Sequence, residues 1–118
     1  MALRQEKWTK LMVPVKLDTP RATLRMDTLF VSPAGMFVPS DLGLEPYTQV
    51  TARFPVEERD VVAHAEVRRI LGESQVAARG INHPSGGTEL RIVRMEGDGS
   101  QILAEHIKKM LMESGGPS

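Results

Sequence analysis

The chain has 118 residues, with 15 basic and 15 acidic side chains and a formal net charge of +0, which suits one domain with a single core. Balanced charge leaves no global field to attract DNA, RNA or an anionic membrane. The absence of cysteine excludes disulfides, thiolate zinc sites and cysteine nucleophiles. The N-terminus, MALRQEKW, has no apolar run of signal-peptide length, and no segment has the apolar length of a membrane span. We therefore expect a cytoplasmic protein.

The first predicted strands follow a short polar stretch. Aliphatic residues recur at every second position over 11–17, and apolar residues alternate with polar ones over 22–27 in a strand that 29–31 continues, as in strands with one buried face. Pro14 cannot donate a ladder hydrogen bond, so we expect the first strand at an edge or with irregular pairing. Residues 32–35, Ser-Pro-Ala-Gly, predict a tight turn from which 36–38 returns as a short strand.

Three further strands are predicted from the same alternation. They cover 50–54, 63–67 and 90–92, and the middle one has the clearest pattern. Residues 55–60 are expected to form a charged hairpin connection. A second connection is expected over 72–87, and its core, 82–87, is predicted to be a surface loop.

The C-terminal segment changes to helical periodicity. Asp98 is predicted to cap a helix, with Gln101 as the reciprocal partner. One apolar stripe runs along this helix; it consists of Leu103, Ile107, Met110 and Leu111. A helix of this kind would cover the open end of a barrel.

Together these elements predict a mainly β fold, a six-stranded antiparallel β-barrel with a C-terminal α-helix. Short antiparallel strands of this number avoid bare edges by closing on themselves. The predicted organisation is a polar arm over 1–9, the barrel and helix over 10–114 and a tail over 115–118.

Catalytic and metal-binding patterns are missing from the sequence. His64, His83 and His106 do not have the spacing of metal ligands. No nucleophile–base pair or paired carboxylates stand out, and Gly86–Thr88 lacks the lysine of a P-loop. We therefore expect no enzyme, no metal and no cofactor.

The segment Val31–Val38, VSPAGMFV, resembles the Ser-x-x-Gly core of PilZ domains and the strand that follows it there. The order of the later segments is also similar: VTARF over 50–54, AHAEVRR over 63–69, GTELRIV over 87–93 and a final helix. The resemblance covers roughly residues 10–113. It implies a six-stranded barrel with a C-terminal helix that binds cyclic-di-GMP and relays its presence to a partner.

The cyclic-di-GMP pattern of that family is only partly present. It consists of Arg-x-x-x-Arg before the first strand and Asp/Asn-x-Ser-x-x-Gly at the turn into the third. Ser32 and Gly35 match, but Phe30 stands at the acceptor position and no arginine pair with the required spacing lies upstream. Lysine does not replace the bidentate guanidinium. The resemblance thus implies weak or absent cyclic-di-GMP binding, with these candidates if the nucleotide binds: Arg4, Lys7, Lys10, Ser32 and Gly35.

Four residues are candidates for contact with a protein partner: Trp8, Arg68, Leu111 and Met112. Trp8 can dock on a partner, stack on a base or be buried against the barrel. Arg68 and Arg69 are adjacent, so we expect them on opposite faces of the sheet, with only one lining a site. Leu111 and Met112 form either an exposed strip near the helix end or part of the core.

Three functions remain open. The first hypothesis is a non-enzymatic adaptor that contacts a protein partner of a bacterial signalling system, in motility, polarity, surface-appendage or exopolysaccharide control. The second is a cyclic-di-GMP receptor with non-standard contacts. The third, a small nucleic-acid-binding barrel, is disfavoured by the zero net charge and the single Trp and Tyr.

Overall fold

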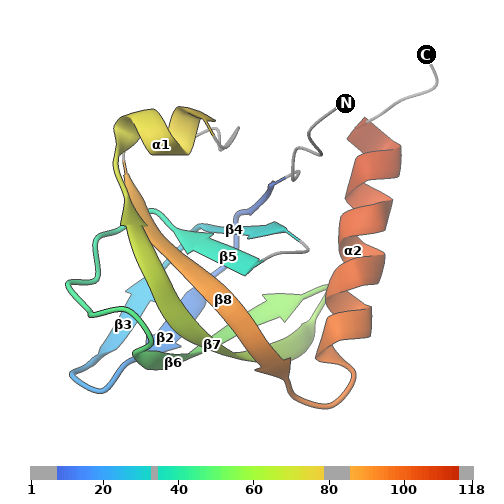
Figure 1. Ribbon diagram of the computed structural model, residues 1–118. Coiled ribbons are helices and arrows are strands. Elements are labelled where there is room, and N and C mark those ends of the chain that lie inside the picture. Colours follow the sequence, from blue (N-terminus) through green and yellow to red (C-terminus); the bar gives the residue numbers. More distant parts are fainter. Residues whose placement is uncertain (1–7, 33–34, 79–85, 115–118) are drawn as a thin grey trace.

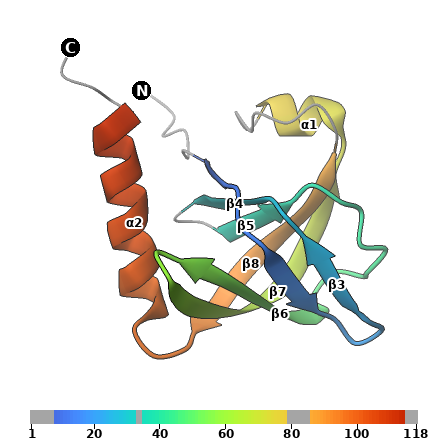
Figure 2. The same cartoon turned by 180° about the vertical axis from the view of Figure 1, so that it is seen from behind.

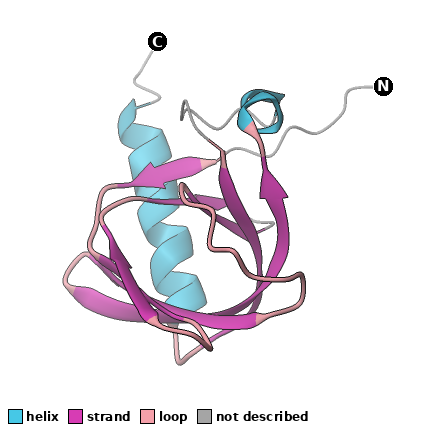
Figure 3. Ribbon diagram, turned by 90° about the vertical axis from the view of Figure 1, so that its left-hand side faces the viewer, coloured by secondary structure: helices cyan, strands magenta, loops and turns pink. Residues whose placement is uncertain are grey.

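A computed structural model of the chain describes residues 8–32, 35–78 and 86–114, the last four by their backbone only. Eight strands form one antiparallel sheet in the order β1-β4-β5-β8-β7-β6-β2-β3. The sheet curls into a half-barrel with α2 against one side (Figures 1 and 3). The elements are β1 (Thr9–Leu11), β2 (Val15–Asp18), β3 (Thr23–Met26), β4 (Leu29–Ser32), β5 (Gly35–Val38), β6 (Gln49–Val56), β7 (Arg59–Leu71), α1 (Glu73–Ala78), β8 (Gly87–Met95) and α2 (Gly99–Ser114).

The mainly β, antiparallel prediction is confirmed, but the number of six strands is wrong. Both of the first two predicted strands are interrupted, at residues 12–14 and at 27–28. Pro14 lies in the first interruption, where its missing N–H breaks the ladder. β1 pairs with β4 and β2 pairs with β3, so a bent two-stranded ribbon connects the two ends of the strand order (Figure 2). The bends turn two expected strands into four.

The interior of the half-barrel holds the main core. β6 and β7 alternate between buried and more exposed positions, because successive side chains of a strand point to opposite faces. α2 packs against β6 and β7. Its buried Leu103 joins the core, with Ile107 and Met110 partly buried beside it. The predicted apolar stripe is confirmed at these three positions.

Two local predictions near the helices differ from the structure. Asp98 directly precedes α2 and its carbonyl accepts from Ile102 N–H (3.0 Å), but no hydrogen bond joins Asp98 to Gln101, whose Nε2 donates to Glu105 Oε1 (3.2 Å). The predicted connection over 72–87 contains α1, whose Val76 is buried, and most of the loop expected at 82–87 lies outside the described residues. Val76 alone gives too weak an apolar period to reveal a helix of one and a half turns. His83 lies outside the described residues.

Among the described residues, no helix is long and apolar enough to cross a membrane.

Candidate functional site

The β4–β5 hairpin carries the two matched positions of the PilZ pattern. Ser32 pairs with Gly35 across the hairpin, and Ser32 is buried. A Cβ atom at Gly35 would overlap the carbonyl oxygen of Leu90, because β5 runs closely beside β8. Close backbone approach is therefore sufficient to explain this glycine, without any ligand.

Phe30, at the acceptor position, lies in a second apolar cluster. Its ring meets that of Phe37 edge-to-face, with centroids 5.7 Å apart and planes at 65°. Phe30 and Phe37 form this cluster with Leu71 of β7 and Val76 of α1, and Trp8 packs against it. We call these five residues the outer cluster. The strand neighbours of Phe30 belong to the interior core, so Phe30 points to the outside of the sheet and is buried there by covering residues.

The candidate nucleotide-binding residues are only partly brought together. Arg4 and Lys7 lie outside the described residues. Lys10 pairs with Phe30 in register, and its Nζ lies 6.0 Å from the centroid of the Phe30 ring, a cation–π distance. Trp8 is partly buried against the outer cluster. Lys10 and Trp8 thus lie beside Phe30, which stands at the position where the PilZ pattern has a carboxylate or amide.

Arg68 lines a pocket of about 420 Å³ on another part of the sheet. The β7–β8 register passes from Val67↔Leu90 to Arg69↔Glu89, which leaves Arg68 as the extra residue of a β-bulge. Both arginines line the pocket, so the prediction that only one could do so is wrong. A bulge interrupts the two-residue alternation on which that prediction depended.

The charges of this pocket are largely paired. Arg69 Nε lies 3.2 Å from Oε1 of the buried Glu89. Arg91 Nε donates to Glu66 Oε1 (2.9 Å). Arg68 makes no ion pair with another described residue. One exposed guanidinium is therefore left to meet an anionic group.

Tyr47 forms the other wall of the same pocket. This residue is 79% exposed, and its φ of 71° is unusual for a residue with a side chain. Its backbone N–H donates to the carbonyl of Val67 (2.7 Å), which holds the loop against β7. Sequence reasoning missed Tyr47, and the only local signal was the turn former Pro46 before it.

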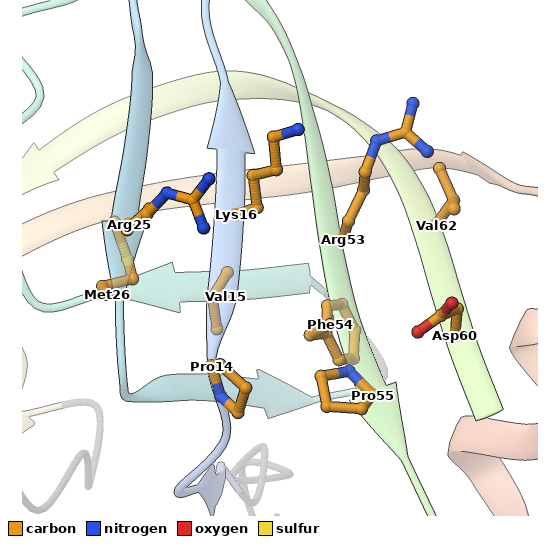
Figure 4. A pocket seen from close by; sticks show the side chains of 10 residues that line it. All are labelled: Pro14, Val15, Lys16, Arg25, Met26, Arg53, Phe54, Pro55, Asp60 and Val62. Carbon is orange, nitrogen blue, oxygen red and sulfur yellow. The ribbon is translucent and has the colours of Figure 1, made fainter. Parts of the chain in front are cut away.

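A third feature, also missed from the sequence, is a pocket of about 370 Å³ on the outer side of β2, β3, β6 and β7 (Figure 4). Its rim carries basic side chains and its floor is apolar. The lining residues are Pro14, Val15, Lys16, Arg25, Met26, Arg53, Phe54, Pro55, Asp60 and Val62. The three cations, Lys16, Arg25 and Arg53, lie on three strands that pair with one another, and the register of this pairing makes them neighbours.

The two described histidines both meet carboxylates. His64 Nε2 lies 2.7 Å from Glu96 Oε2, and its Nδ1 lies 3.3 Å from Thr51 Oγ1. The hydrogen bond from His64 lowers the pKa of Glu96. Thr51 and His64 line neither of the two pockets described above. A molecule bound in either pocket would therefore not contact these side chains. Among the described residues, no group of histidine, aspartate and glutamate side chains could hold a metal.

The second histidine connects α2 to the β6–β7 turn. His106 Nδ1 lies 3.0 Å from Glu57 Oε2, and Lys109 Nζ donates to Glu57 Oε1 (3.4 Å). The histidine hydrogen bond and the nearby lysine lower the pKa of Glu57. These contacts fix the helix on the sheet. Leu111 and Met112 follow in α2, but their side chains lie outside the description, so their role as a partner strip stays a prediction.

Comparison with known proteins identifies the fold. No protein-family model matches the chain, and no curated protein sequence matches it. Among solved structures, the chain is similar to the inhibitor of motility MotI/DgrA of Bacillus subtilis, with a TM-score of 0.62 and 19% sequence identity. The match covers 94% of this chain and 52% of that one, so this chain spans about half the length of that protein. At this identity the likeness shows a shared fold, the β half-barrel with its C-terminal helix.

Proposed function

We propose that the chain is a non-enzymatic regulatory domain of the PilZ type, which acts through contacts with a protein partner of a bacterial signalling or motility system. Its cyclic-di-GMP binding is weak or absent. The observation that carries the proposal is Phe30, buried in the outer cluster at the position where the PilZ pattern has a hydrogen-bonding side chain. The likeness in fold to an inhibitor of motility supports a regulatory role.

The energetic reason is the loss of several polar contacts on one face. Phe30 cannot accept a hydrogen bond from a guanine edge, and Lys10 does not reproduce the two-pronged contact of an arginine. Each missing buried contact costs about 1–3 kcal/mol. A few such losses together lower the affinity by several powers of ten. A shared fold whose expected ligand face is covered by apolar side chains suits a domain that is recognised by another protein.

A second candidate is a cyclic-di-GMP receptor with non-standard contacts. Ser32 and Gly35 keep their places in the hairpin, and Lys10 lies beside Phe30. In that function, the lysine would meet a phosphate and the partly buried Trp8 ring would contact a base.

Calorimetric titration with cyclic-di-GMP at moderate salt separates the two candidates. We expect no binding heat at high protein concentration. Micromolar or tighter binding that is lost in Lys10→Ala and kept in Lys108→Ala, a lysine of α2, would establish the receptor instead. In parallel, cross-linking in native cells is expected to yield a protein bound to the chain, and failure to find any would contradict the adaptor function.

A further inference from the structure

Three cations form a row across neighbouring strands at the pocket of Figure 4. Lys16 of β2 lies directly opposite Arg25 of β3 on one side and opposite Arg53 of β6 on the other. All three side chains are exposed on the outer face of the sheet. We call them the basic row. Like charges that face each other across strands destabilise a sheet, so the row is an arrangement that folding alone does not favour.

The carboxylates near the row neutralise only part of it. Asp18 accepts from Thr23 Oγ1 (2.8 Å) and lies 3.6 Å from Arg53 Nε. Asp60 lines the opposite side of the pocket. Lys16 and Arg25 make no ion pair with another described residue. Two cations without a direct ion pair therefore stand side by side, with the Asp18 carboxylate near Lys16, and attract an anionic group.

The floor below the row is apolar. Pro14, Pro55 and Val62 provide the apolar lining on the outer face (Figure 4), and buried Val15 and Phe54 belong to the interior core behind them. A pocket of about 370 Å³ lies in the size range of ligand sites and accommodates an apolar side chain next to a carboxylate.

We propose that this pocket binds an acidic segment of a partner protein, with carboxylates on the basic row and an apolar side chain on the floor. The identification of the partner as a protein rests on the proposed function. Asp18 and Asp60 border the row, so the continuous phosphates of a nucleic acid or the headgroups of a membrane would meet carboxylates on both sides. The zero net charge of the chain also gives no long-range attraction to such polyanions. A short acidic segment fits between these borders.

The test is an NMR titration of the ¹⁵N-labelled chain with acetyl-Glu-Leu-Glu-Leu-Glu-amide. The control peptide has glutamine in place of each glutamate. We expect shifts of backbone amides in β2, β3 and β6 with the acidic peptide only. Because exposed ion pairs each contribute only modestly to binding, the variant Lys16→Gln/Arg25→Gln should bind about tenfold more weakly. The matched variant Arg21→Gln/Arg94→Gln, with the same change of net charge outside the pocket, should bind as the wild type does.

Three results would overturn the proposal: equal shifts with the neutral peptide, shifts outside these strands, or no shift at millimolar peptide. A single-stranded oligonucleotide or a phosphatidylglycerol vesicle that binds the basic row more tightly than the peptide would also overturn it, in favour of a polyanion. These failures differ from failure of the proposed function. If cross-linking in cells finds a partner that the Lys16→Gln/Arg25→Gln variant retains in full, the adaptor function stands and this pocket is not its docking site.

Discussion

Two regions on the outer side of the sheet differ in character: a covered face over β4 and β5, and an open face over β2 and β3. Over β4 and β5, outward-facing Phe30 and Phe37 are buried under Trp8 and α1. Over β2 and β3, outward-facing Lys16 and Arg25 are exposed beside a pocket. Strand alternation creates both sets of outward positions. The difference teaches that an outward position becomes a second core where another segment covers it and stays a contact surface where none does.

The largest expected effect tests whether the covered face is a true core. We expect Phe37→Ala to lower the free energy of unfolding by about 3–5 kcal/mol, because it leaves a cavity among packed aromatic and aliphatic side chains. Urea denaturation followed by circular dichroism measures this. Lys16→Ala, at an outward position of the open face, should change stability by no more than about 0.5 kcal/mol. Similar values for the two variants would remove the contrast between the faces.

A second test asks whether Gly35 on the covered face is structural. Gly35→Ala should destabilise the fold by about 1–3 kcal/mol, since the new methyl group would meet the backbone oxygen of Leu90. Differential scanning calorimetry would detect the drop in Tm. A Cβ atom at Gly72 would have only the Gln75 side chain within 4 Å. Gly72→Ala is therefore the matched control and should be close to neutral. A neutral Gly35→Ala would free this glycine for a ligand role.

A third test concerns the β6–β7 turn, which follows Pro55 at the edge of the open face. Glu57 and Glu58 have φ values of 49° and 70°, a conformation that costs residues with a side chain about 1–2 kcal/mol. Glu58→Gly should therefore raise the free energy of unfolding by about 1 kcal/mol. Arg59→Gly, in the strand next to it, should lower it by about 0.5–1 kcal/mol. A loss of stability in Glu58→Gly would show that the Glu58 side chain matters more than the backbone strain.

The smallest expected effect is a pH dependence at the same turn. Hydrogen bonding from His106 and the charge of Lys109 hold the folded-state pKa of Glu57 below its ordinary value of 4.5. A lowered carboxyl pKa stabilises the fold above the ordinary value, and this contribution disappears as pH falls through the folded-state pKa. The stability gap between wild type and Glu57→Gln should thus be present at neutral pH and close in acid. Urea unfolding across this pH range measures the gap, and a gap that does not change with pH would contradict the ion pair.

Much of the fold was accessible from local patterns. The alternation over 63–67 lies inside β7, and the stripe at Leu103, Ile107 and Met110 faces the core. The strand number was wrong because the interruptions at 12–14 and 27–28 depend on how a ribbon bends between two parts of the sheet. The short helix α1 was missed because only one of its residues, Val76, is buried, and Val76 packs on strands that are elsewhere in the chain.

The candidate sites could be predicted from the sequence less well than the fold could. Arg68 was singled out, but its sharing of a pocket with Arg69 comes from a bulge, which forms only when two strands pair out of step. The basic row escaped notice because Lys16, Arg25 and Arg53 look like ordinary solvated positions of separate strands. Their proximity is a property of the register.

The sequence by itself determined which side chains of each strand share a face, which face of α2 is apolar, and that the acceptor of the PilZ pattern is replaced by Phe30. These properties follow from the periods of strand and helix, which are local. The tertiary structure alone decided that Phe30 is covered while Lys16 is open, that three cations stand in a row, and that a bulge puts two adjacent arginines in one pocket. Covering, register and bulges arise from contacts between residues far apart in the chain, and no local period encodes them.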